Sequence, residues 1–136
     1  MVRRLALLLC LTATVGLACD CIVVPAREAR GYADVVFRGA IVRVRDSGTG
    51  YKVVMFHVNR VWKGQVWETF EVGNLGGDMC NGFLPYLPLN VGDELLVYAH
   101  RTPPDSEYFP LTCNTDLVTR AKDIQKLGPG RKPTAR

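Results

Sequence analysis

The chain has 136 residues and a formal net charge of +4. That length is enough for one domain with a modest hydrophobic core, and the sequence contains no internal repeat and no second domain. Much of the positive charge lies at the two ends, because without Arg3 and Arg4 the 17 basic residues fall to 15 against 13 acidic ones. The remaining charge of +2 (15 minus 13) gives no reason to expect a nucleic-acid partner.

The first 18 residues predict a removable export signal, here called the leader. A basic start is followed by an apolar run, Leu5–Val15, and small residues precede Cys19. Gly16 and Ala18 hold the positions where a signal peptidase requires small side chains, so we expect cleavage between Ala18 and Cys19. The run is too short to span a bilayer, although an uncleaved anchor is an alternative. We therefore expect a soluble mature chain that is secreted or periplasmic.

Cysteine parity agrees with that cleavage. Of the 5 cysteines, Cys10 leaves with the leader, and Cys19, Cys21, Cys80 and Cys113 remain. An even number in an oxidising compartment favours two disulfides. A bridge between Cys19 and Cys21 would need too tight a ring, so each remaining pairing ties the N-terminus to distant parts of the chain.

Two other uses of these cysteines are alternatives to the disulfides. Acylation of Cys19, as in bacterial lipoproteins, would anchor the protein to a membrane and would leave an odd number of cysteines with one orphan thiol. A zinc site is disfavoured, because Cys19 and Cys21 are closer together than the usual spacer of structural zinc ligands.

The middle of the chain predicts β structure. Runs rich in β-branched and aromatic residues, separated by turn-forming residues, are Asp34–Arg45, Tyr51–Trp62, Trp67–Val72 and Glu94–Ala99. In the second run, Val54, Phe56 and Val58 alternate with Met55, His57 and Asn59, as in a half-buried strand. The last run is expected to be the most buried. Short strands joined by tight turns are typical of a small closed barrel or a sandwich.

The remaining segments predict short helices and loops. Pro25–Tyr32 contains helix formers between a proline and a glycine, and Thr115–Leu127 has apolar residues at helical spacing, which predicts a helix packed on the barrel. The glycine-rich and proline-rich loop Gly73–Asn90 contains Cys80, and such a crosslinked loop suits a binding surface. Residues 129–136 predict a disordered basic tail.

Nothing in the sequence predicts an enzyme. His57 and His100 are the only histidines, and neither is spaced from a carboxylate or a cysteine as metal ligands are. An even set of disulfide cysteines leaves no thiol nucleophile, and the sequence contains no phosphate-binding loop and no serine elbow. We therefore expect a protein that is not an enzyme and has no cofactor of its own.

Six segments occur in a characteristic order. They are Cys19-Asp20-Cys21, Ala33–Gly39, Val61–Gly64, Cys80 with Gly82 and Phe83, Leu96–Ala99 and Leu111–Cys113. Together they resemble the tissue inhibitors of metalloproteinases and, more broadly, the netrin-like modules, over nearly the whole mature chain. The resemblance implies a mainly β fold, an OB-fold-like five-stranded β-barrel with flanking helices over residues 19–128. It also implies disulfides joining Cys19 to Cys80 and Cys21 to Cys113.

The resemblance further implies a secreted, monomeric inhibitor of zinc metalloproteases. The free α-amino nitrogen and the carbonyl oxygen of Cys19 would bind the catalytic zinc of the partner protease and displace the water that the enzyme uses as its nucleophile. The inhibitor would carry no metal itself. A ridge held together by one of the bridges would contact the protease, and its residues are Cys19, Asp20, Cys21, Ile22, Val23, Asp78, Met79, Cys80 and Asn81.

Several features depart from the family pattern. Asp20 stands where a small or uncharged residue enters the specificity pocket of the protease, and burying an unpaired carboxylate there is costly. Gly31 stands at the position of a further family cysteine, so a third bridge is missing. The sequence also lacks the cysteine-rich second domain. A netrin-like protein-binding module that uses another face of the barrel is the alternative function.

Overall fold

A computed structural model describes residues 22–46, 51–74, 82–83, 87, 89–101 and 107–135. The elements in chain order are α1 (Ala26–Tyr32), β1 (Val35–Asp46), β2 (Lys52–Lys63), β3 (Thr69–Asn74), β4 (Glu94–His100), β5 (Phe109–Pro110), β6 (Asp116–Leu117) and the 3-10 helix η1 (Ile124–Leu127). The described part of the chain is therefore mainly β, as the sequence predicts. It contains no helix that is long and apolar enough to cross a membrane.

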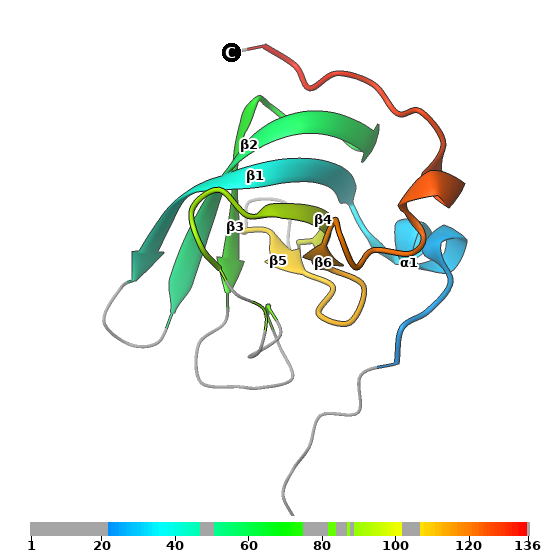
Figure 1. Cartoon of the computed structure of the whole chain (residues 1–136), viewed down its shortest axis with the longest axis horizontal. Helices are drawn as coiled ribbons and strands as arrows, with labels where there is room; N and C mark the ends of the chain where they lie inside the picture. The colour runs from blue at the N-terminus through cyan, green and yellow to red at the C-terminus, as the bar shows by residue number, and fades with distance from the viewer. Residues whose placement is uncertain are drawn as a thin grey trace, which may run out of the picture.

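The strands form one antiparallel sheet in the order β3-β2-β1-β4-β5, and β6 also pairs with β4 (Figure 1). Register shifts along β1 mark bulges, which bend a strand and allow a sheet to curl. The curl brings the two ends of the sheet together, because the Gly73 N–H donates a hydrogen bond of 2.8 Å to the Tyr108 carbonyl oxygen. This curled half-barrel belongs to the β-barrel class that the sequence predicts.

The four long strands begin and end within 2 residues of the segments that the sequence predicts. The predicted alternation in β2 is confirmed, because Val54, Phe56 and Val58 are at most 1% exposed whereas His57 and Asn59 are exposed. The prediction that β4 is the most buried strand is also confirmed, since its residues from Leu95 to Ala99 are all buried. The helix predicted near the N-terminus is present as α1.

The concave side of the sheet encloses the main core. Its centre is aromatic: the Phe37 ring meets the Phe56 ring at 5.4 Å and the Phe70 ring at 5.3 Å, both edge to face. The alternate residues of β1, β2 and β4 complete this core, which is buried because successive strand side chains point to opposite faces.

A second, smaller core lies on the convex side, between the sheet and its helical cover of α1 and η1 (Figure 1). Ala29 of α1 is fully buried, and its small side chain lets the helix approach Val36 and Leu96 of the sheet. Tyr98 and Leu127 fill the rest of this core. β1 and β4 therefore supply side chains to both cores at once.

The segment Thr115–Leu127 is not the helix that its apolar spacing predicts. It contains the short strand β6 and, near its end, η1. The Thr115 hydroxyl is hydrogen-bonded to both the N–H and the carbonyl oxygen of Tyr98, at 3.1 Å each. Short polar side chains that bond the backbone in this way compete with helix formation. The apolar residues are divided between the two cores: Leu117 packs on the main core, and Ala121 packs on the second.

The C-terminal segment also differs from the disordered tail that its composition predicts. The N–H and carbonyl groups of Arg131 and Val61 are hydrogen-bonded to each other, both at 2.8 Å. Thr134 N–H donates to the Val66 carbonyl at 2.9 Å, and Glu68 N–H donates to the Thr134 carbonyl at 3.1 Å. Backbone groups along the end of β2 and the following turn thus find partners in residues 129–135, which we call the C-terminal strap.

Candidate functional site

The predicted protease-contacting ridge is described only at one end. Ile22 and Val23 are part of the structure, and their apolar side chains are 76% and 63% exposed. The other ridge residues lie outside the described residues: Cys19, Asp20, Cys21, Asp78, Met79, Cys80 and Asn81. What the structure shows is therefore how the chain holds the residues that directly follow the Cys-Asp-Cys motif.

Asn114 holds the N-terminal segment in place. Its Nδ2 donates a hydrogen bond of 2.9 Å to the Val24 carbonyl, and its Oδ1 accepts a longer one of 3.4 Å from the Val24 N–H. One amide side chain therefore satisfies both backbone groups of Val24, as a neighbouring strand would. Asn114 lies in the turn after β5, and the adjacent Thr115 is fully buried and bonded to β4. The N-terminal segment is thus tied to the centre of the sheet.

Cys113 precedes this asparagine and is disulfide-bonded. Its partner lies outside the described residues, as do all the other cysteines of the chain. The specific bridges Cys21–Cys113 and Cys19–Cys80 therefore stay predictions.

A cavity of about 370 Å³ lies beside this anchor, and Val23, Cys113 and Asn114 are among its lining residues. Tyr98 also lines it, although its hydroxyl is buried and has no hydrogen-bond partner among the described residues. Burial, together with the nearby Asp123 carboxylate, raises the pKa of Tyr98 to about 12. The Arg120–Asp116 ion pair, at 2.8 Å, borders the same cavity.

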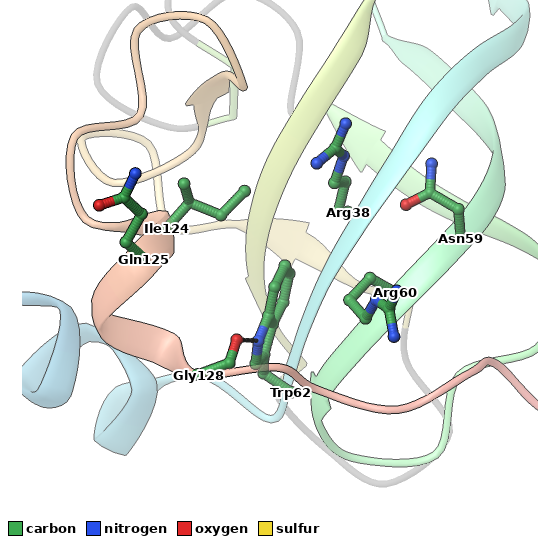
Figure 2. A pocket seen from close by; sticks show the side chains of 7 residues that line it. All are labelled: Arg38, Asn59, Arg60, Trp62, Ile124, Gln125 and Gly128. Carbon is green, nitrogen blue, oxygen red and sulfur yellow. Dashed lines mark hydrogen bonds between the residues drawn. The ribbon is translucent and has the colours of Figure 1, made fainter.

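A second cavity, of about 450 Å³, lies between the convex face of β1 and β2 and the chain around η1 (Figure 2). Arg38 lies at its wall and forms an ion pair with Glu94 of β4. The hydrogen bond within this pair, from Arg38 Nε to the Glu94 carboxylate, raises the pKa of the Arg38 guanidinium and lowers the pKa of the Glu94 carboxyl. Asn59 Nδ2 donates to the same carboxylate at 3.1 Å. Trp62 donates from Nε1 to the Gly128 carbonyl at 2.8 Å, which joins β2 to the chain after η1.

A third cavity, of about 420 Å³, opens beside Trp67, Phe70 and Tyr108. The Arg101 guanidinium lies over the Tyr108 ring, 5.2 Å from its centroid. The Arg101 N–H donates to Asp34 Oδ2 at 2.8 Å. The cation at this cavity is therefore already engaged by groups of the protein itself.

The histidines lie apart from these cavities. His57 is an exposed residue of β2, and His100 ends β4. In the described part of the chain, no group of three or more His, Cys, Asp or Glu side chains is arranged to hold a metal ion.

The residues that organise these sites could not be recognised from the sequence. Asn114 could not be singled out from the sequence, because its contact with Val24 joins residues 90 positions apart. Arg38 and Trp62 belong to segments that carry the family resemblance, but the resemblance does not predict that these two residues line a cavity. Their grouping depends on the register between β1 and β2, which the local sequence does not specify.

Comparison of this sequence with known protein families and with curated proteins finds no match to either. The curled antiparallel sheet gives the fold class. The likeness to tissue inhibitors and netrin-like modules stays a prediction.

Proposed function

We propose that this protein is a secreted inhibitor of zinc metalloproteases, with an OB-type barrel that presents the N-terminal Cys19 to the zinc of a partner protease. The observation that carries the proposal is the anchor at Val24, where Asn114 fixes the chain just after the Cys-Asp-Cys motif and just beside the disulfide-bonded Cys113.

The anchor supports the bridge between Cys21 and Cys113. Three residues span at most about 10 Å when extended, so an anchored Val24 keeps Cys21 close to Asn114. Cys113 is the neighbour of Asn114 in the chain. A bridge at that point would order the residues before it, and a pre-ordered segment loses less entropy when it binds.

The exposed side chains of Ile22 and Val23 suit a binding edge. They are apolar, and they follow the motif directly. In a complex they would be removed from water, a gain of about 25 cal/mol for each Å² of apolar surface buried.

The strand pairing supports the OB-type barrel. With the Gly73–Tyr108 hydrogen bond included, each of the first five strands has a neighbour on both sides, in the cyclic order β1-β2-β3-β5-β4. A five-stranded barrel with nonsequential neighbours of this kind is the pattern of an OB-fold. The helix α1 and the chain around η1 cover its convex side.

The inhibitory chemistry requires an unmodified N-terminus. The α-amino nitrogen and the carbonyl oxygen of Cys19 would close a five-membered ring with the zinc ion of the protease, taking the place of its water. The Asp20 carboxylate would then enter the specificity pocket. Because an unpaired carboxylate is costly to bury, we expect the target protease to offer a cationic or hydrogen-bond-donating group there.

The test compares the mature protein, beginning at Cys19, with a version that carries one additional alanine before Cys19. Both are assayed against a panel of zinc metalloproteases with a fluorogenic peptide substrate. The extension removes the chelating amine, so we expect the inhibition constant to rise by about 100-fold, equal to roughly 2.7 kcal/mol. One alanine added after Arg136 serves as the matched control and should leave inhibition unchanged.

Circular dichroism confirms that each version is folded. Equal inhibition by the mature and the N-terminally extended proteins would contradict the chelation mechanism. Absence of inhibition by either version would favour the alternative, a netrin-like module that binds partners through another face.

A further inference from the structure

We propose that the cavity beside Arg38, Arg60 and Trp62 is a binding site for a small anionic molecule that carries a carboxylate or a phosphate group. This site lies on the convex face of the sheet, and it does not depend on the N-terminal chelation mechanism. Its volume of about 450 Å³ is within the usual range for small-molecule sites.

The charges at this cavity are unbalanced. Arg38 of β1 and Arg60 of β2 are register partners, directly opposite each other in the sheet. Like charges at opposed positions of two strands destabilise the pair. The structure gives these two cations one carboxylate, that of Glu94, which is bonded to Arg38. The Arg60 guanidinium makes no ion pair and no hydrogen bond with any described residue, so one positive charge lacks a counter-charge.

Both arginines are held in position. Arg38 donates to Glu94 through Nε, so the bond orients its guanidinium and leaves its two Nη groups without a partner among the described residues. The stem of Arg60 lies against the C-terminal strap, where a Cβ on Gly130 would be 3.0 Å from its Cγ and Cδ atoms. Oriented guanidinium groups are suited to carboxylate and phosphate groups, which they bind through paired hydrogen bonds.

The remaining walls of the cavity combine an aromatic ring with amide groups. Trp62 contributes a ring that is held in place by its bond to Gly128, and Gln125 and Asn59 present amide groups from opposite sides of the cavity (Figure 2). An indole ring provides a flat apolar surface for the organic part of a ligand. Amide N–H groups add neutral donors for its oxygen atoms. Two cations, amide donors and one aromatic wall together fit an organic anion better than a neutral or cationic ligand.

The test titrates the mature protein with sodium phosphate and, separately, with sodium acetate at constant ionic strength, with sodium chloride as the control salt. The readout is the indole N–H signal of Trp62 in nuclear magnetic resonance spectra. The chain has 2 tryptophans, and Trp67 lines a different cavity, so its signal reports effects elsewhere. We expect the Trp62 signal to shift with saturation in phosphate, in acetate or in both. The anion that binds more tightly identifies whether the natural ligand carries a phosphate or a carboxylate group.

The matched variants are Arg60→Gln, which removes the unpaired cation, and Arg43→Gln, which removes an exposed cation of β1 outside the cavity. We expect Arg60→Gln to weaken anion binding by about tenfold, as for the loss of a charge-assisted hydrogen bond. Arg43→Gln should change it by less than about twofold, as for a distant surface charge. Arg60→Lys should recover part of the affinity, because it restores the charge without the planar fork.

Thermal unfolding gives a second readout, since a ligand that binds the folded state raises the midpoint. Phosphate or acetate should raise the midpoint of the wild-type protein and of Arg43→Gln more than that of Arg60→Gln. The proposal is overturned if the Trp62 signal responds linearly to every salt, or if the two glutamine variants lose binding equally. Because no protease is used, failure here leaves the inhibitor proposal untouched.

Discussion

Tyr98 is the largest side chain that is fully buried in the described part of the chain, and its hydroxyl lacks a hydrogen-bond partner there. The ring contributes to the second core, beneath α1 and η1. A buried hydroxyl without a partner costs about 1–3 kcal/mol of desolvation that no hydrogen bond returns. The backbone of the same residue, in contrast, is fully satisfied by Thr115. The residue thus combines a well-packed ring with an unfavourable polar atom.

We therefore predict that Tyr98→Phe increases the free energy of unfolding by about 1 kcal/mol. The pKa of Tyr98 is raised to about 12 in the folded state, whereas an unfolded tyrosine titrates near about 10. The folded state therefore holds the phenolic proton more tightly than the unfolded state does. The free energy of unfolding of the wild-type protein is constant below about pH 10 and falls as the pH rises from about 10 toward 12. Urea unfolding from pH 7 to 11 measures both effects, and the variant should decline less steeply above about pH 10. A loss of stability at pH 7 would show that the hydroxyl has a partner.

At the scale of elements, the C-terminal strap is held by backbone geometry. Gly130 has a φ of 64°, and a Cβ atom there would lie 2.8 Å from the Val61 carbonyl oxygen. Arg131 adds a side-chain hydrogen bond from Nη2 to the Gly64 carbonyl. The strap also contacts the stem of Arg60, so its position affects the second cavity.

We predict that Gly130→Ala detaches the strap. Both the positive φ and the short contact oppose a side chain, so the variant should lose about 1–2 kcal/mol of unfolding free energy. Gly31→Ala is the matched control, because Gly31 lies in α1 and nothing lies within 4 Å of its added Cβ. That control should gain a few tenths of a kcal/mol, about 0.5, from helix propensity.

Amide hydrogen exchange identifies the detachment directly. The N–H groups of Arg131 and Thr134 should exchange faster in Gly130→Ala, while those of β4 should keep their protection. Unchanged protection at Arg131 and Thr134 would show that the strap does not depend on this glycine.

The protein as a whole is organised by two strands with a core on each side. β1 and β4 place alternate side chains in the main core and in the second core. The residues that hold the N-terminal segment are attached to this frame through Thr115. A binding edge mounted on the centre of the sheet is held more rigidly than one on an unsupported loop.

At the scale of the complex, we predict that inhibition weakens in acid. The Cys19 amine must lose its proton to bind zinc, and an α-amino group has a pKa of about 7.7–8.0. Inhibition is therefore strongest above that range and should fall by about tenfold for each pH unit below it. Inhibition constants measured between about pH 6 and 8.5 give the profile, with an inhibitor that has no titrating zinc ligand as the control for the protease itself. A profile that matches that control would rule out binding through the amine.

The main strands could be predicted from the sequence because period-two patterns act locally. The run Glu94–Ala99 is almost continuously apolar, which is typical of a strand covered on both faces, and β4 ends one residue later, at His100. The helix predicted for Thr115–Leu127 was wrong, because its apolar residues serve two different cores and its polar residues bond strand backbone. Local spacing cannot distinguish one helical face from alternating contacts with two surfaces.

The candidate sites were less predictable for a related reason. The exposed pair Ile22 and Val23 belongs to the predicted ridge, but their anchor, Asn114, is distant in sequence. The cavity beside Arg38 requires the bulge that shifts the register between β1 and β2, together with the later return of the chain past Trp62. Bulges, registers and returning segments are set by long-range hydrogen bonds, which leave no local signature.

The two described ends of the protein lie on opposite sides of the molecule (Figure 1). The strap carries the chain across the end of β2, away from the segment that Asn114 holds. A fluorescent dye, a purification tag or a solid support can therefore be attached at the C-terminus with the proposed binding edge facing outward. The fold thus provides a ready orientation for biosensor surfaces, on which candidate proteases can be tested one by one for binding to the proposed edge.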